Sequence, residues 1–313
     1  MKTHRCPVVL GVVVVVLQAL LYTLFGYLVM GFHSTGRFEY VENTTLGEIC
    51  LFIEGLYREL GPGYGCLVES PVVESDTCYT STNMLAVYVL RSICGNSVLA
   101  ENVERFLELY KTGFYDYYQV LLGLPIQLPF NATSHVVAGR VGEITVKHVI
   151  VLDRVMEDYD EYANLVAIKA IHHARRGERE EAARELEKLR RLYNGVGFRD
   201  KAFNGYYETY KLALAATAYS MVGYDEEALR LLEAIREVKP LTTLYTENKT
   251  GVGDLNLETA CLVAIAINQT IHTRNKHYDA LLNQGRVEAK LLILITLLVL
   301  ITILLLRHHS GKH

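Results

Sequence analysis

The 313-residue sequence predicts a mainly α-helical domain that is tethered to a membrane at both of its ends. Three observations carry this prediction. A long uncharged apolar run lies near each end of the chain, a helix–glycine–helix pattern repeats in the middle, and cysteines and glycosylation sequons gather between the two runs. Together they indicate an extracytoplasmic helical domain over residues 33–289.

The first element is the apolar run over residues 7–32, which contains no charged side chain. It is long enough to cross a bilayer core of roughly 30 Å. A secretory signal peptide needs an apolar stretch of only about 7–15 residues, followed by a small-residue cleavage site. The sequence GYLVMGFHS has no such site. We therefore expect an uncleaved transmembrane anchor rather than a signal peptide, with residues 1–6 as a short tail.

The last element is the Leu- and Ile-rich run over residues 290–306, followed by a tail over residues 307–313. A soluble helix would keep one polar face, and this run has none. All 35 Asp and Glu residues lie between the two runs, whereas basic side chains occupy both tails. Basic tails stay in the cytoplasm. The sequence thus predicts a cell-membrane protein with two spans, both termini in the cytoplasm, and the lipid bilayer as a partner.

Sequons and cysteines favour the same topology. Four N-glycosylation sequons lie between the spans, at Asn43, Asn131, Asn248 and Asn268. Four cysteines cluster in the first part of the domain, an even set that is typical of an oxidising compartment. We expect Cys66 to pair with Cys78 around one loop and Cys50 with Cys94 between two helices, although three connectivities are open.

Between the spans, periodicity predicts helices with one β-hairpin among them. Residues 46–60 have the pattern of an amphipathic helix, and residues 81–94 and 101–113 read as two helices joined by a glycine turn. Residues 135–153 are rich in β-branched side chains and glycine, which favours a β-hairpin inserted between helices.

An internal repeat follows. A shift of 46 residues aligns residues 161–191 with 207–237, so that Gly177 matches Gly223. Each unit reads as helix, glycine turn, helix, because glycine can adopt the left-handed conformation that ends a helix. The first helix of each unit is apolar and the second is charged, which indicates an inner and an outer layer. Another inner helix starts near Glu258, fifty residues after Glu208.

Long loops precede the inner helices, and one of them places Gly197-Phe198 before Glu208-Thr209. In this respect residues 158–268 resemble the α/α-toroid folds, in particular the prenyltransferase and squalene-cyclase-like repeats. The resemblance implies a toroid in which the N-termini of the inner helices surround one mouth; an open α-solenoid is the alternative. The tryptophan usual in that family is absent, as are its Asp-rich signature and zinc ligands, so no catalytic residue is carried over.

In such a toroid, acidic and tyrosine side chains near the starts of the inner helices would share one cleft. The candidates are Asp200, Glu208, Asp254, Glu258, Tyr206 and Tyr207. Paired carboxylates are what glycoside hydrolysis requires, and tyrosine rings stack on sugars. The competing interpretation is helix capping, in which Asn204 or Asn256 serves as N-cap and a glutamate in the first turn complements the helix dipole.

The sequence gives little support for other classes of function. His172 and His173 are adjacent on a helix and cannot form a metal-binding pair, and we expect no metal and no cofactor. The acidic balance argues against nucleic acid as a partner. The absence of Trp and the many Arg and Glu residues are archaeal-like and thermophilic in character. We expect a cell-envelope binding or scaffolding protein that presents its helical domain to a polysaccharide or a protein partner; a carbohydrate-active enzyme that uses the cleft carboxylates is the alternative.

Overall fold

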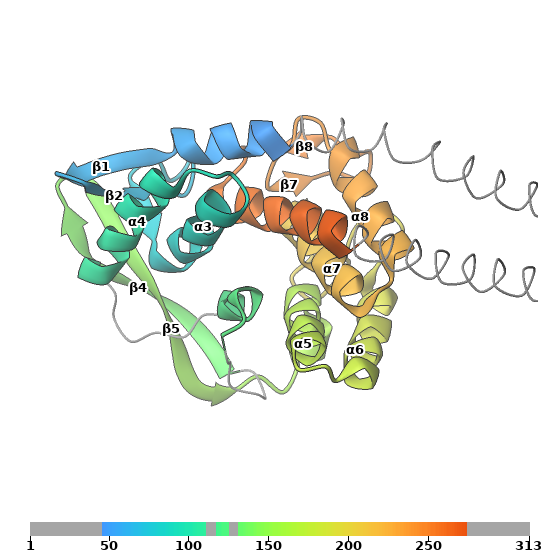
Figure 1. Ribbon diagram of the computed structural model, residues 1–313. Helices are drawn as coiled ribbons and strands as arrows, with labels where there is room; N and C mark the ends of the chain where they lie inside the picture. Colours follow the sequence, from blue (N-terminus) through green and yellow to red (C-terminus); the bar gives the residue numbers. More distant parts are fainter. Residues whose placement is uncertain (1–45, 111–116, 125–130, 274–313) are drawn as a thin grey trace, which may run out of the picture. The chain divides into compact units, whose positions relative to one another are not determined.

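The structure is a computed structural model that describes residues 46–110, 117–124 and 131–273. The chain divides into two compact units, residues 1–51 and 52–313. Of the first unit, only residues 46–51 are described, and they are helical. All elements from β1 onward belong to the second unit, which is mainly helical and carries small sheets (Figure 1).

Helical hairpins form the main part of the second unit, as the repeat predicts. The helices are α3 (Thr80–Ser92), α4 (Ser97–Tyr110), α5 (Ala163–Arg175), α6 (Arg179–Leu192), α7 (Thr209–Val222), α8 (Asp225–Glu237) and a last helix whose described part spans residues 257–273. Short 3-10 helices η1 (Tyr117–Leu122) and η2 (Tyr159–Glu161) lie between them. Helix α5 packs on α6 and on α7, and α7 packs on α8 (Figure 1).

The two layers differ in burial as their composition predicts. Every residue of α7 from Leu212 to Ala218 is buried, because small apolar side chains let neighbouring helices approach on all sides. The outer helix α8 buries only one stripe, which includes Leu231 and Ile235, and its remaining side chains are mostly charged. The inner and outer positions predicted from the sequence are therefore confirmed for this hairpin.

Glycine ends the first helix of each repeated hairpin. Gly223 has a φ of 96° and caps α7 in the left-handed conformation, while the N–H of Tyr224 donates to the carbonyl of Tyr219 at 3.0 Å. Gly177, with a φ of 76°, follows α5, and the N–H of Glu178 donates to the carbonyl of His173 at 3.0 Å. Only glycine adopts this backbone without steric cost, which explains why the repeat keeps it.

The predicted β-hairpin is present and is longer than expected. Strands β4 (Asn131–Val141) and β5 (Ile144–Val155) pair antiparallel around Gly142. Strand β3 (Thr77–Tyr79) joins the other edge of β5 in parallel, which gives the order β3-β5-β4 (Figure 1). Since β3 leads directly into α3, this sheet fixes the start of the first inner helix.

The prediction of a helix over residues 46–60 is wrong in its last part. The helix ends at residue 55, and Tyr57–Gly61 forms strand β1, which pairs antiparallel with β2 (Tyr64–Leu67). The two strands are joined by Pro62 and Gly63, and the φ of 73° at Gly63 suits glycine in this tight connection. Pairing with β2, a contact that sequence periodicity cannot report, overrides the helical pattern of β1.

Cys66 and Cys78 form a disulfide, the pair that the sequence favours. Cys50 and Cys94 are also disulfide-bonded, whereas Cys261 is a buried free thiol. Cys66 lies in β2 and Cys78 in β3, so their bond joins two sheets around the loop between them. That loop carries Glu69.

The loops before α7 and before the last helix contain short strands that the sequence did not indicate. Strands β6 (Tyr207–Glu208), β7 (Leu244–Tyr245) and β8 (Gly251–Val252) form a three-stranded antiparallel sheet. Tyr207 stacks on Tyr245 with ring centroids 5.4 Å apart. This sheet holds the chain that enters α7.

Both predicted membrane spans, 7–32 and 290–306, lie outside the described residues, as does the sequon at Asn43. Within the residues that the structure describes, no helix is both long enough and apolar enough to cross a membrane. Of the other sequons, Asn131 begins β4, Asn248 is exposed between β7 and β8, and Asn268 is half-buried in the last helix.

Candidate functional site

A polar pocket of about 420 Å³ lies where the inner helices begin. The N-terminal ends of α3, α5, α7 and the last helix all contribute to its wall. The loop after β2, the 3-10 helix η1, the end of β3 and the segment between β5 and α5 also contribute to the lining. The polar side chains of the lining include Glu69, Glu74, Ser81, Asn164, Tyr210 and Glu258.

One helix position recurs in this wall. Ser81, Asn164, Tyr210 and Glu258 are each the second residue of their helix. Side chains in the first turn of a helix project back toward its N-terminus. A set of inner helices that start around one point therefore directs the same position of each helix into one pocket. The common starting point of these four helices thus produces the site.

Glu69 is the carboxylate most firmly held in the pocket. Its backbone N–H donates to the carbonyl of Thr77 at 2.7 Å, and its own carbonyl accepts from the N–H of Leu257 at 2.7 Å. Its carboxylate accepts from the Thr82 hydroxyl at 2.8 Å and from the N–H of Glu258 at 3.3 Å. Glu69 therefore links the disulfide-bound loop to the starts of α3 and of the last helix.

Burial raises the pKa of Glu69 well above its usual value, and the nearby carboxylate of Glu258 raises it further. Hydrogen bonds from Thr82 and from the N–H of Glu258 favour the charged form but are outweighed. Two carboxylates at one buried site cannot both ionise without repulsion. Burial and the neighbouring Glu258 therefore both favour the protonated form of the Glu69 carboxyl.

Glu258 accepts a hydrogen bond from the Tyr118 hydroxyl of η1 at 2.6 Å. Tyr210, from α7, is largely buried, and burial raises the pKa of its hydroxyl well above the usual value, with further increases from Glu208, Glu258 and Asp200. The hydroxyl of Tyr210 thus stays protonated. It makes no hydrogen bond to another described residue, and neither do the side chains of Ser81 and Asn164. These three groups are available to a ligand.

An ion pair closes one edge of the pocket. Lys147 of β5 lies 3.3 Å from the carboxylate of Glu74 and donates to the Tyr79 hydroxyl at 3.0 Å. The Tyr79 hydroxyl donates to Glu74 at 3.0 Å, and the Lys147 ammonium lies 4.8 Å from the centroid of the Tyr79 ring. The charge of Glu74 is therefore balanced within the protein.

Asp200, one of the predicted cleft residues, does not line the pocket. Its buried carboxylate lies 2.8 Å from the ammonium of Lys211 and accepts from the N–H of Ala163 at 2.9 Å. Ala163 is the first residue of α5, so Asp200 caps that helix from the neighbouring loop. Asp200 therefore has a structural role, because it joins the start of α5 to Lys211 of α7.

Glu208 and Glu258 match in the sequence but differ in the structure. Glu208 ends β6 and precedes α7, where its side chain pairs with Lys211. Glu258 lies inside its helix, because the side chain of Asn256 accepts from the N–H of Thr259 at 2.9 Å and starts the helix earlier. Asn256 is thus an N-cap, as the capping interpretation proposes. Only Glu258 of the two glutamates lines the pocket.

The remaining predicted cleft residues serve the surrounding loops. Asp254 accepts a hydrogen bond from the hydroxyl of Ser70, beside Glu69. Tyr206 is exposed, whereas Tyr207 is buried and its hydroxyl donates to Glu247 at 2.8 Å and accepts from Arg199 at 3.0 Å. Neither tyrosine is among the residues that line the pocket.

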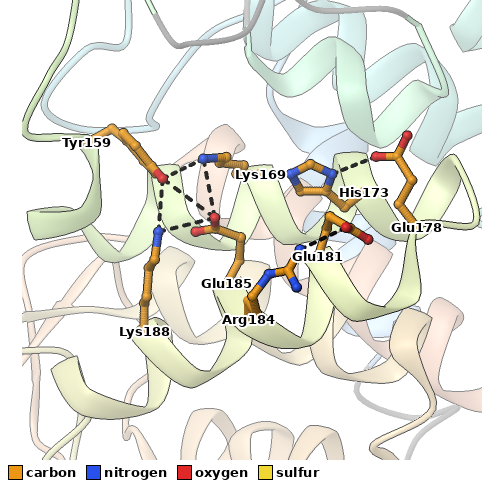
Figure 2. Close-up of polar contacts among 8 residues, drawn as sticks. All are labelled: Tyr159, Lys169, His173, Glu178, Glu181, Arg184, Glu185 and Lys188. Carbon is orange, nitrogen blue, oxygen red and sulfur yellow. Dashed lines mark hydrogen bonds and ion pairs between the residues drawn. The ribbon is translucent and has the colours of Figure 1, made fainter.

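Figure 2 shows a second polar cluster, which joins η2 to α5 and α6 outside the pocket. The carboxylate of Glu185 lies 3.2 Å from the ammonium groups of both Lys169 and Lys188. Both lysines donate to the Tyr159 hydroxyl and lie over its ring, at 4.1 Å and 5.2 Å from the centroid. At the end of α5, His173 pairs with Glu178 at 2.7 Å.

Sequence reasoning did not single out Glu69. The available signal was an acidic residue directly after the apolar pair Leu67-Val68, inside a loop that two cysteines close. Among the described residues, no group of His, Cys, Asp and Glu is arranged to hold a metal ion. No family model matches the chain, and no curated protein or solved structure is significantly similar to it.

Proposed function

We propose that the protein is a membrane-anchored binding protein of the cell envelope, and that its extracytoplasmic helical domain binds a sugar unit of a polysaccharide in the pocket at the inner-helix N-termini. One observation carries the proposal. The second residues of four helices meet in one polar pocket, and three of them offer groups without a hydrogen-bond partner among the described residues.

The chemistry of the lining suits a hydroxyl-rich ligand. The volume of about 420 Å³ lies within the range of about 300–1,000 Å³ that is common for small-ligand pockets. The hydroxyl of Tyr210 and the amide of Asn164 can donate to ring and hydroxyl oxygens, while Glu69 and Glu258 can accept from hydroxyl groups. Tyrosines such as Tyr117 and Tyr162 also line the pocket, and an aromatic ring is a side chain against which a sugar ring packs.

We further propose that the hairpins close into an α/α toroid with this pocket at its mouth, because four inner helices begin at the pocket and α5 packs directly on α7. The membrane topology remains as the sequence predicts it. Protease applied to intact cells should digest the domain over residues 33–289 and spare both tails. Protection of that domain from the protease would overturn the orientation.

The binding proposal is tested with the full chain in lipid nanodiscs on an array of envelope and plant glycans. We expect retention of a defined glycan set. The double variant Tyr210→Phe and Asn164→Ala should weaken that binding by at least tenfold, because two donors without other partners are lost. The control Glu233→Gln removes an exposed glutamate of α8 and should bind as the parent does. Retention of no glycan, or equal binding by the double variant, would refute the proposal.

A second candidate is glycoside hydrolysis, which is favoured by the raised pKa of Glu69 beside a second carboxylate, Glu258, in the same pocket. Glu69 would donate its proton to the leaving oxygen as the glycosidic C–O bond breaks, and Glu258 would take a proton from the attacking water. A carboxyl whose pKa is raised by burial is typical of the general acid in such pairs. Glycans bound in the array are incubated with the protein, and new reducing ends are measured. Glu69→Gln should abolish the release of reducing ends. Release by this variant, or no release by the parent, would refute hydrolysis and leave sugar binding as the proposed function.

A further inference from the structure

The carboxylates of the pocket and its tyrosines suit a positively charged ligand better than a neutral one. Three glutamates line the pocket, and no Lys, Arg or His is among the described residues of its lining. Lys147 balances Glu74 from outside this lining. An anionic ligand such as phosphate or a uronic acid would meet the glutamates of the pocket and find no cationic side chain among the described lining residues.

Aromatic faces point to the same ligand chemistry. Five tyrosines line the pocket beside the glutamates: Tyr79, Tyr117, Tyr118, Tyr162 and Tyr210. An ammonium group is attracted both to a carboxylate and to the negative face of an aromatic ring. A neutral sugar could use the rings and hydroxyls, but it would bring no positive charge to the three glutamates that line the pocket.

The protein holds its own ammonium groups in this way. At the pocket edge, Lys147 lies between Glu74 and the ring of Tyr79. In the cluster of Figure 2, Lys169 and Lys188 lie between Glu185 and the ring of Tyr159. In both places the amine is bound by one glutamate and one tyrosine, the two residue types that dominate the pocket.

We propose that the pocket binds a protonated amine, and that the sugar unit it takes is an amino sugar whose amine is not acetylated. The inference rests on the proposed function for the sugar part of the ligand. The ammonium group would lie between Glu69 and Glu258, while the ring hydroxyls contact Tyr210, Asn164 and Ser81. Acetylation removes the positive charge of the amine and would therefore remove the preference of the pocket for the amino sugar.

Binding of an amine should release a proton from the pocket. An ammonium group beside Glu69 favours its ionised form, which the empty pocket disfavours. The titratable groups that face Glu69 are Glu258 and the Cys261 thiol on the last helix and Glu74 in the loop after β2, with Lys147 paired to Glu74. Burial keeps the Cys261 thiol protonated, so Glu69 is the group that supplies the proton.

The test is calorimetric titration of the full chain in nanodiscs with four probes at mildly acidic pH. The probes are a glucosamine tetramer, its fully N-acetylated form, a glucose tetramer and spermidine. We expect the glucosamine tetramer to bind at least tenfold more tightly than the two uncharged tetramers. Titrations in buffers of different ionisation enthalpy should show up to one proton released with glucosamine and none with the uncharged sugars.

The outcomes separate this inference from the proposed function. Equal binding of the three tetramers would overturn the amine preference and leave sugar binding intact. Binding of spermidine without binding of any sugar would support the ammonium site and overturn the sugar proposal. Binding of no probe would overturn both.

Variants locate the amine. Glu258→Gln and Glu69→Gln should each reduce the preference for glucosamine over glucose at least tenfold, because each removes one of the two carboxylates. The matched control Glu233→Gln, on the exposed face of α8, should keep the preference. Circular dichroism verifies that each variant is folded, and the proton-release measurement on the parent needs no variant. Full preference in both pocket variants would refute the assignment.

Discussion

The substitution Glu69→Gln isolates one charge of the pocket with little change in shape. In the parent, the carboxylate accepts from the N–H of Glu258 at 3.3 Å and from the hydroxyl of Thr82 at 2.8 Å. In the variant, the glutamine side-chain oxygen can still accept from the N–H of Glu258, and the glutamine amide can donate to the hydroxyl oxygen of Thr82. The Thr82 hydroxyl can then donate to the carbonyl of Tyr79, which is 3.3 Å away. Only the titration is lost.

The sign of the effect follows from proton binding. Burial, and then Glu258, raise the pKa of Glu69 in the folded state, so the folded protein holds this proton more tightly than the unfolded chain. The resulting stability is fully present below the unfolded pKa of about 4.3 and is lost as pH rises from there through the folded pKa. Within that window the loss is about 1.4 kcal/mol per pH unit. Glutamine has no such dependence.

Thermal unfolding of the full chain, followed by circular dichroism in a pH series, measures the difference. Since 1 kcal/mol shifts Tm by about 2–4 °C in a domain of this size, the Tm of the variant relative to the parent should rise by about 3–6 °C per pH unit above pH ~4.3. The exposed control Glu233→Gln should follow the parent closely. Parallel Tm curves for Glu69→Gln and the parent would refute the raised pKa of the buried Glu69.

Three further predictions concern the scaffold and use thermal unfolding. Lys211→Met leaves the buried Asp200 uncompensated and should cost about 3–5 kcal/mol, whereas Lys201→Met removes only exposed pairs and should cost under about 1 kcal/mol; equal costs would contradict the burial. Gly223→Ala should cost about 1–2 kcal/mol, since its φ is 96° and no atom lies near the new methyl; a neutral result would exclude this conformation. Cys66→Ser should cost about 2–4 kcal/mol, and free thiols at both Cys66 and Cys78 in non-reducing peptide maps would contradict the bond.

Local patterns predicted the helical hairpins well. The 46-residue repeat gives α5–α6 and α7–α8, with a glycine at the end of each first helix, because turn chemistry and apolar periodicity act over only a few residues. The β-branched stretch gives β4 and β5 for the same reason. The helix over residues 46–60 failed where β1 pairs with β2, since pairing between strands depends on a partner outside the segment.

Local sequence patterns predicted only part of the candidate site. Glu258 was found because it follows the repeated helix-start pattern, and Tyr210 stands two residues from Glu208 in the same pattern. The repeat also suggested that Glu208 and Glu258 are equivalent. Asn256 starts the last helix earlier, however, and turns one glutamate into the pocket while the other pairs with Lys211.

The sequence by itself determined the helical hairpins, the inner and outer layers and the favoured disulfide, because each of these is written in neighbouring or regularly spaced residues. Tertiary structure alone decided which carboxylates share a pocket. Glu69 and Glu258 are 189 residues apart in the chain and meet through the N–H of Glu258 at the start of the last helix. Contacts at that separation depend on how sheets, loops and helix starts pack, and packing leaves no periodic trace in the sequence.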